Sequence, residues 1–131
     1  MPVPPALGRA ARIFRRGLRL ACPRCGGARL FSGWFTMTPE CPLCGLRYER
    51  AQGYFVGAIY INYAVTVAVA AGVVLAADAL VGLTLAEQLV LGVALAALVP
   101  LAFFRYARSL WLSLDYLVTT ADERRERARL R

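Results

Sequence analysis

The chain has 131 residues, about the size of one ordinary domain, and 59% of them are hydrophobic, against roughly 45–50% in soluble proteins. Charged residues make up only 18%, and the net charge is +8. These values exclude an ordinary soluble domain. The lack of histidine also removes the commonest general base and most catalytic metal sites, so we expect no enzymatic activity.

Residues 1–21 are predicted to form a basic amphipathic arm. Four arginines recur at steps of three or four residues, which places them on one face of a helix: Arg9, Arg12, Arg16 and Arg19. Four apolar residues recur at the same steps on the opposite face: Leu7, Ala11, Phe14 and Leu18. This pattern favours a helix bound to anionic lipid at a membrane surface. A solvated tail is the alternative, and nucleic-acid binding is a weaker interpretation.

All four cysteines lie in two matching units that predict a metal site in residues 22–50. The units are Cys-Pro-x-Cys-Gly, fifteen residues apart, and their cysteines are Cys22, Cys25, Cys41 and Cys44. Two residues between cysteines let one tight turn direct both thiolates at one ion, and two such turns supply the four ligands of structural Zn²⁺. We also expect Gly26 and Gly45 to adopt positive φ. Iron–sulfur clusters and Cu(I) also accept four thiolates and stay open as alternatives.

The sequence between and after the two units predicts the short strands of a zinc ribbon. Ser32-Gly33 is a turn pair, and a third strand is expected at residues 46–48. The apolar set of this ribbon is small: Leu30, Phe31, Trp34, Phe35, Met37, Leu46 and Tyr48. Because so few residues hardly stabilise a fold alone, we expect one structural Zn²⁺.

Two long uncharged stretches follow the ribbon and predict membrane-spanning helices. Residues 51–77 contain no charge over 27 positions, and residues 88–104 contain none over 17. A membrane helix needs about 20 mostly apolar residues. We therefore predict transmembrane helices at 54–77 and 86–106.

The connection at 78–85 is short, so the two helices are expected to pack as an antiparallel hairpin. Alanine and glycine recur every four residues along the first helix, as in close helix contacts in lipid. Pro100 is expected to kink the second helix. All sixteen arginines lie outside 78–85, so the positive-inside rule places the loop outside and both termini in the cytoplasm.

A polar cluster near the start of the first span provides candidate partner-binding residues. An aromatic belt at the membrane interface explains Tyr54, but an asparagine within hydrocarbon is costly unless it has a partner. Asn62 is therefore expected to face the second helix or another protein, together with its neighbours Tyr60 and Tyr63.

A cytoplasmic helix and charged tail are predicted at residues 107–131. Arg108 and Asp115 lie on one face of this helix, seven residues apart. If the helix passes close to the ribbon, these two side chains are candidates to pair with charges at 47–50. A solvated charged face is the alternative.

The paired cysteine units, GYFVGAIYINY (53–63) and FRYARSLWLSLDY (104–116) together resemble a bacterial family, the domain-of-unknown-function family numbered 983. The resemblance implies small zinc-ribbon proteins with two spans in the bacterial cytoplasmic (inner) membrane. It also implies genes that in some bacteria lie near those for cytochrome oxidase subunits and assembly factors.

The sequence therefore predicts a mainly α-helical chain with a small β zinc ribbon in the cytoplasm, followed by a transmembrane hairpin. The favoured function is a non-enzymatic interaction protein, an assembly factor or accessory subunit of a membrane complex such as a respiratory oxidase. The alternatives are a protein that passes Cu(I) or zinc to a membrane metalloprotein, and a ribbon that binds nucleic acid at the membrane.

Overall fold

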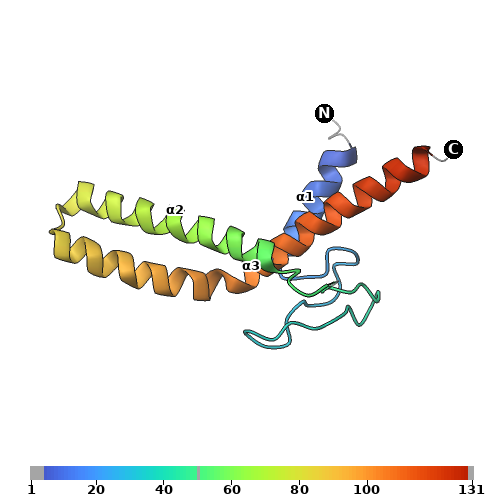
Figure 1. The fold of residues 1–131 in the computed structure, drawn as a ribbon, viewed down its shortest axis with the longest axis horizontal. Helices are drawn as coiled ribbons and strands as arrows, with labels where there is room; N and C mark the ends of the chain where they lie inside the picture. Colours follow the sequence, from blue (N-terminus) through green and yellow to red (C-terminus); the bar gives the residue numbers. More distant parts are fainter. Residues whose placement is uncertain (1–4, 50, 130–131) are drawn as a thin grey trace.

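The computed structural model describes residues 5–49 and 51–129, with side chains described from 6 to 120 except at position 50. The described residues form three helices: α1 (Pro5–Leu18), α2 (Val56–Val81) and α3 (Leu85–Arg129). Figure 1 shows that α2 runs beside the first half of α3 and that α1 lies along its second half. The segment between α1 and α2 lies against the middle of α3, so α3 contacts every other part of the fold.

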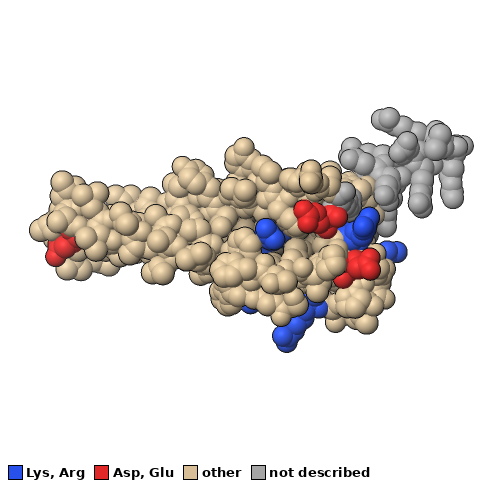
Figure 2. Space-filling model, turned by 60° about the horizontal axis from the view of Figure 1, so that its bottom comes forward, with Lys and Arg blue, Asp and Glu red and all other residues tan. Residues whose placement is uncertain are grey.

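Two of these helices are long and apolar enough to cross a membrane: α2, and α3 over Leu85–Thr120. Figure 2 shows that the end of the molecule toward the α2–α3 connection has no basic side chain on the visible face and has an acidic patch at its tip. The basic side chains visible on this face lie at the opposite end, beside the cysteine-containing segment.

The connection between α2 and α3 is shorter than the predicted 78–85 and comprises residues 82–84. Gly82 ends α2 in a left-handed conformation (φ 70°), and its N–H donates to the carbonyl oxygen of Asp78 at 2.8 Å. A capping box starts α3, because the Glu87 carboxylate accepts from the Thr84 N–H at 2.8 Å and the Glu87 N–H donates back to the Thr84 hydroxyl. These two caps let both helices extend into the segment predicted as loop.

Helix α3 is continuous over 45 residues, so the predicted second span and the predicted C-terminal helix are one element. Pro100 lies inside it and removes one backbone hydrogen bond. Figure 1 shows α3 changing direction between its two halves, in agreement with the predicted kink. The continuous helix joins the apolar half of the molecule rigidly to the half that carries the cysteines.

The predicted ribbon strands are wrong, because no strand forms in the described residues of this segment. Only three isolated antiparallel bridges occur: Ala21 with Arg29, Phe31 with Met37, and Glu40 with Arg47. Turns follow one another so closely that each extended stretch is too short to continue a ladder beyond one pair.

The small core of this segment depends on α3. Leu30, Phe31 and Tyr48 are buried as expected, and Leu112 of α3 is fully buried among them. Trp34 and Phe35, which the sequence assigned to the ribbon's apolar set, are 54% and 57% exposed. The core therefore forms between the segment and the helix, and the loop that carries both aromatic side chains lies outside it.

Candidate metal centre

The two cysteine units fold into equivalent turns. In the first, the Gly26 N–H donates to the carbonyl oxygen of Cys22 at 2.8 Å. In the second, the Gly45 N–H donates to the carbonyl oxygen of Cys41 at 2.9 Å. Gly26 and Gly45 have φ of 71° and 69°, which confirms the predicted left-handed conformation. The glycines thus reverse the chain directly after the second cysteine of each unit.

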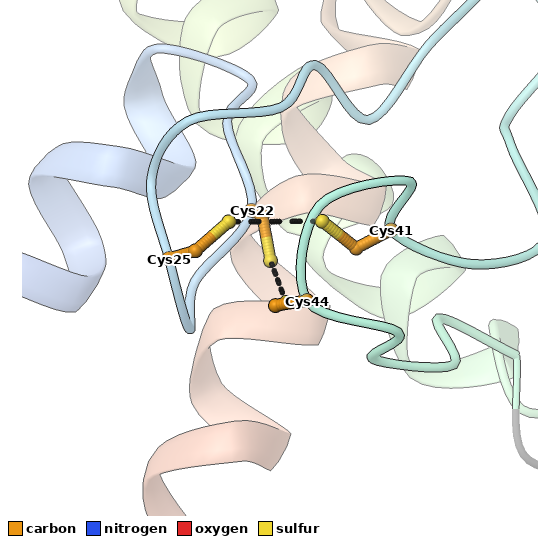
Figure 3. A group of neighbouring side chains, drawn as sticks. All are labelled: Cys22, Cys25, Cys41 and Cys44. Carbon is orange, nitrogen blue, oxygen red and sulfur yellow. Dashed lines mark hydrogen bonds between the residues drawn. The ribbon is translucent and has the colours of Figure 1, made fainter.

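Figure 3 shows the four cysteine side chains converging from these two turns. The Sγ atoms of Cys22 and Cys44 are 3.7 Å apart, and those of Cys25 and Cys41 are 3.6 Å apart. All four sulfurs lie within 4.8 Å of one another. A tetrahedral ion with bonds of about 2.3 Å requires sulfurs about 3.8 Å apart, whereas a disulfide requires about 2.05 Å. The cluster therefore fits one metal ion and contains no disulfide.

Within each unit the two cysteines differ in exposure, the first being buried and the second partly exposed. Cys22 and Cys41 are buried, while Cys25 and Cys44 are partly exposed. Burial raises the pKa of Cys44 to about 12, and a backbone hydrogen bond from Gly27 lowers the pKa of Cys25. Because a bound cation favours thiolates, it would oppose the effect of burial at Cys44.

Tyr48 places a hydroxyl group beside the buried sulfurs. Its side chain is fully buried, and its hydroxyl forms no hydrogen bond with any described residue. Burial acts to raise the pKa of Cys41, but the nearby Tyr48 hydroxyl and the N–H groups of Cys44 and Leu43 outweigh it. The result is a Cys41 pKa lowered to about 6. The hydrogen of the Tyr48 hydroxyl rotates freely, so it can turn toward a thiolate at Cys41.

A known protein family matches most of the chain. The chain matches the family described as "Protein of unknown function (DUF983)" over residues 31–116. It belongs to the DUF983 family. The match includes the second cysteine unit and most of the two apolar helices, and it begins after the first cysteine unit. No curated protein and no solved structure matches the chain.

Arginines connect the cysteine cluster of this DUF983 protein and the segment around it to the helices. Arg16 of α1 donates from Nη1 to the carbonyl oxygens of Pro23 (3.2 Å) and Arg24 (2.8 Å), within the first cysteine turn. Arg105 of α3 places its guanidinium 5.2 Å from the ring centroid of Phe31 and 5.1 Å from that of Trp34. From the sequence, Arg16 was expected only on the lipid-binding face and Arg105 had no predicted role, because only the folded chain brings these distant partners together.

The predicted helix in the N-terminal arm forms over Pro5–Leu18. It packs on α3 through Ile13 and Gly17, which do not belong to the predicted apolar face. Ile13 is buried, and the Ser109 hydroxyl donates to the carbonyl oxygen of Gly17 at 2.7 Å. Leu7 and Leu18, on the predicted apolar face, are exposed. Helix α1 therefore contacts α3 through one side and leaves apolar side chains free on another.

Two hydrogen bonds hold the segment just before α2 against α3, beside the cysteine cluster. The Tyr54 hydroxyl donates to Asp115 Oδ2 at 2.7 Å, and the Trp111 indole N–H donates to the Tyr54 carbonyl oxygen at 2.8 Å. From the sequence, Asp115 was a candidate to pair with charges at 47–50. The structure gives it Tyr54 as a hydrogen-bond donor, and position 50 lies outside the described residues.

Arg108 lies one helical turn before Trp111 on α3, and its described contacts are with aromatic rings. Its guanidinium is 4.8 Å from the ring centroid of Phe55 and 4.6 Å from that of Phe104. Within the described part of the chain, neither Glu49 nor Arg47 forms an ion pair with it. Arg108 is therefore held in a fixed place, and its N–H groups donate to no residue that the structure describes.

The three candidate residues on α2 are separated by the fold. The Asn62 side chain donates from Nδ2 to the carbonyl oxygen of Pro100 at 3.1 Å, so it faces α3 within the same chain. Asn62 Oδ1 is buried and accepts no hydrogen bond from any described residue. Tyr60 and Tyr63 are about 70% exposed (72% and 69%) and do not join this contact.

Proposed function

We propose that this DUF983 protein is a membrane-embedded interaction protein whose cysteine cluster binds one structural Zn²⁺. The single observation that carries the proposal is the closed set of four converging sulfurs, packed directly on a helix that continues into an apolar segment. Four protein thiolates leave no open coordination position for substrate or water. A closed site on a rigid support suits the docking of a partner better than catalysis.

The membrane placement is supported by the two long apolar helices and by the distribution of charge. We propose that α2 and the first half of α3 form an antiparallel hairpin across the bacterial cytoplasmic membrane. The arginines then place the cysteine cluster and both ends of the chain in the cytoplasm. The exposed apolar side chains Leu7 and Leu18 of α1 would contact the lipid surface.

The contacts of the hydroxyl groups support a function without catalysis. Ser109 and Ser113 are buried and donate to backbone carbonyl oxygens of Gly17 and Ser109, respectively. Their hydroxyls thus serve helix packing. We therefore propose that the protein binds another membrane protein and contributes to the assembly of a larger membrane complex.

Two measurements test this proposal on the full chain. Elemental analysis of protein purified in mild detergent should give one zinc per chain, and Cys41→Ser should lower that content strongly. Crosslinking from the exposed position Tyr60 in native membranes, followed by purification, should capture one recurring membrane protein. Protein without bound metal, or crosslinks only to unrelated abundant proteins, would contradict the proposal.

The partial exposure of Cys25 and Cys44 favours a second candidate, the transfer of a soft metal ion. An exposed thiolate can be attacked by the ligands of an acceptor protein. In this case the purified chain should carry copper that exchanges within minutes with a Cu(I) chelator. One tightly bound zinc that resists exchange would exclude it.

A further inference from the structure

A pocket of about 360 Å³ lies where α2 begins beside the middle of α3. Its walls are mainly apolar, and two charged side chains of opposite sign line it. The residues that matter here are Phe55, Val56, Ile59, Phe104, Glu49 and Arg108. A pocket with apolar walls and a charge pair suits an amphipathic ligand.

The guanidinium of Arg108 provides the positive charge in a fixed position. The rings of Phe55 and Phe104, at 4.8 and 4.6 Å, restrict it without using any N–H group. Arg108 forms no hydrogen bond or ion pair with any residue that the structure describes. A half-buried guanidinium with five free donors is well suited to a phosphate group, which accepts two parallel hydrogen bonds.

The carboxylate of Glu49 provides the negative charge. Glu49 is exposed and lines the same pocket, and among the described residues it accepts no hydrogen bond. A ligand that places an anion on Arg108 and a cation on Glu49 would neutralise both groups. This charge pattern corresponds to a zwitterion.

The pocket lies at the end of an uncharged stretch. Phe104 is the last residue of the uncharged stretch 88–104, and Val56 and Ile59 belong to the uncharged stretch of α2. In the proposed membrane placement, this is the depth at which lipid headgroups meet acyl chains. The apolar walls would then contact the chains of the same molecule whose headgroup reaches the two charges.

We propose that this pocket binds phosphatidylethanolamine, with its phosphate on Arg108 and its ammonium on Glu49. The proposal rests on the membrane placement given above. Phosphatidylglycerol has no cation for Glu49, and the trimethylammonium of phosphatidylcholine has no N–H donor for the carboxylate. Phosphatidylethanolamine alone among these three lipids supplies both the anion and a cation with donors.

Native mass spectrometry of the full chain released from detergent tests the proposal, with the three lipids present at equal concentration and with identical acyl chains. We expect phosphatidylethanolamine to be retained about tenfold over phosphatidylcholine, because a hydrogen bond to a charged group changes affinity by roughly this factor. Glu49→Gln should abolish this preference. Arg108→Gln should weaken the retention of all three, whereas Arg12→Gln, which removes an exposed arginine of α1, should leave the preference for phosphatidylethanolamine over phosphatidylcholine unchanged.

Equal retention of phosphatidylethanolamine and phosphatidylcholine, or an unchanged preference in Glu49→Gln, would overturn the proposal. So would displacement of the lipid by an equal concentration of soluble O-phosphoethanolamine, since the acyl chains would then add nothing. Glu49 is exposed, so its variant should fold, which far-ultraviolet circular dichroism checks. Extraction of the protein from membranes without detergent would contradict the proposed function itself, whereas a detergent-requiring protein without lipid preference would contradict only this inference.

Discussion

At Gly57, the first turn of α2 meets the ring of Trp111 so closely that a Cβ atom added there would overlap the ring. The same indole donates its N–H to the Tyr54 carbonyl oxygen, which fixes the ring in place. A glycine in a helix interior costs about 1 kcal/mol relative to alanine. At this position, the packing of α2 against α3 therefore stabilises the fold by more than the low helix propensity of glycine costs.

Gly57→Ala should lower stability by about 2 kcal/mol. The overlap with a fixed ring costs up to about 3 kcal/mol, and the gain in helix propensity returns about 1 kcal/mol. Thermal unfolding in detergent measures the effect. Gly72→Ala is the matched control, because nothing lies within 4 Å of a Cβ at that position, and it should be neutral or slightly stabilising. Equal unfolding temperatures for both variants would refute the close contact.

The Tyr48 hydroxyl should also influence the pH at which the cysteine cluster releases a bound metal ion. This hydroxyl helps to lower the Cys41 pKa to about 6, so protons displace a metal ion from that thiolate only at acid pH. Tyr48→Phe raises the Cys41 pKa, and protons then compete with the metal at higher pH. We expect the midpoint of metal release to rise by about one pH unit, since a hydrogen bond to a charged group is worth about 1.5 kcal/mol.

A Co²⁺-substituted protein provides the measurement, because its thiolate-to-metal absorption disappears as the ion leaves. The control is Tyr60→Phe, which removes an exposed hydroxyl away from the cysteines and should leave the midpoint unchanged. An unchanged midpoint in Tyr48→Phe would show that the hydroxyl does not act on the thiolate.

Among the elements, the loop at 32–36 lies beside the middle of α3. The rings of Phe35 and Phe104 have centroids 5.4 Å apart, and Arg105 lies over Trp34. Phe104 ends an uncharged stretch, so the loop lies at the depth where the proposed membrane begins. Its exposed aromatic side chains are of the type enriched at membrane interfaces.

Trp34 should therefore be quenched by brominated lipids when the protein is reconstituted in vesicles. We expect the strongest quenching with bromine near the headgroup end of the acyl chain and weaker quenching with bromine at the bilayer centre. Trp34→Phe identifies the contribution of this residue, because the remaining tryptophan, Trp111, is partly buried against α2. Identical quenching of wild type and Trp34→Phe would place the loop in water.

On the scale of the whole molecule, α3 connects two different surfaces. Figure 1 shows both ends of the chain at one end of the molecule and the α2–α3 connection at the other. The first half of α3 contacts α2, its second half contacts α1, and the cysteine segment lies against its middle. The continuous helix thus fixes the cysteine cluster relative to the two long apolar helices.

Labelling of intact cells tests the proposed orientation. A membrane-impermeant maleimide should label Val81→Cys, which is 77% exposed at the end of α2, without lysis. Arg12→Cys on α1 should be labelled only after lysis, because the arginine-rich end is expected in the cytoplasm. The reverse pattern would invert the orientation, and labelling of both before lysis would contradict a spanning hairpin.

The sequence by itself determined the features that depend on local patterns. The two long apolar helices follow from uncharged stretches, and the cysteine cluster follows from two matching turns whose glycines adopt the expected φ. Such features need only neighbouring residues, since helix rise and turn geometry are local properties. The family resemblance was likewise confirmed over residues 31–116.

Only the tertiary structure decided which distant side chains meet. The Ser109–Gly17 and Tyr54–Asp115 hydrogen bonds join residues 92 and 61 positions apart. Helix α3 supplies Leu112 to the small core of the cysteine segment. Because this helix completes the core, the segment forms only isolated bridges in place of the predicted strands, and Trp34 stays exposed. Helical periodicity gives the faces of a helix, but which face packs against which neighbour depends on the shape and volume of both surfaces.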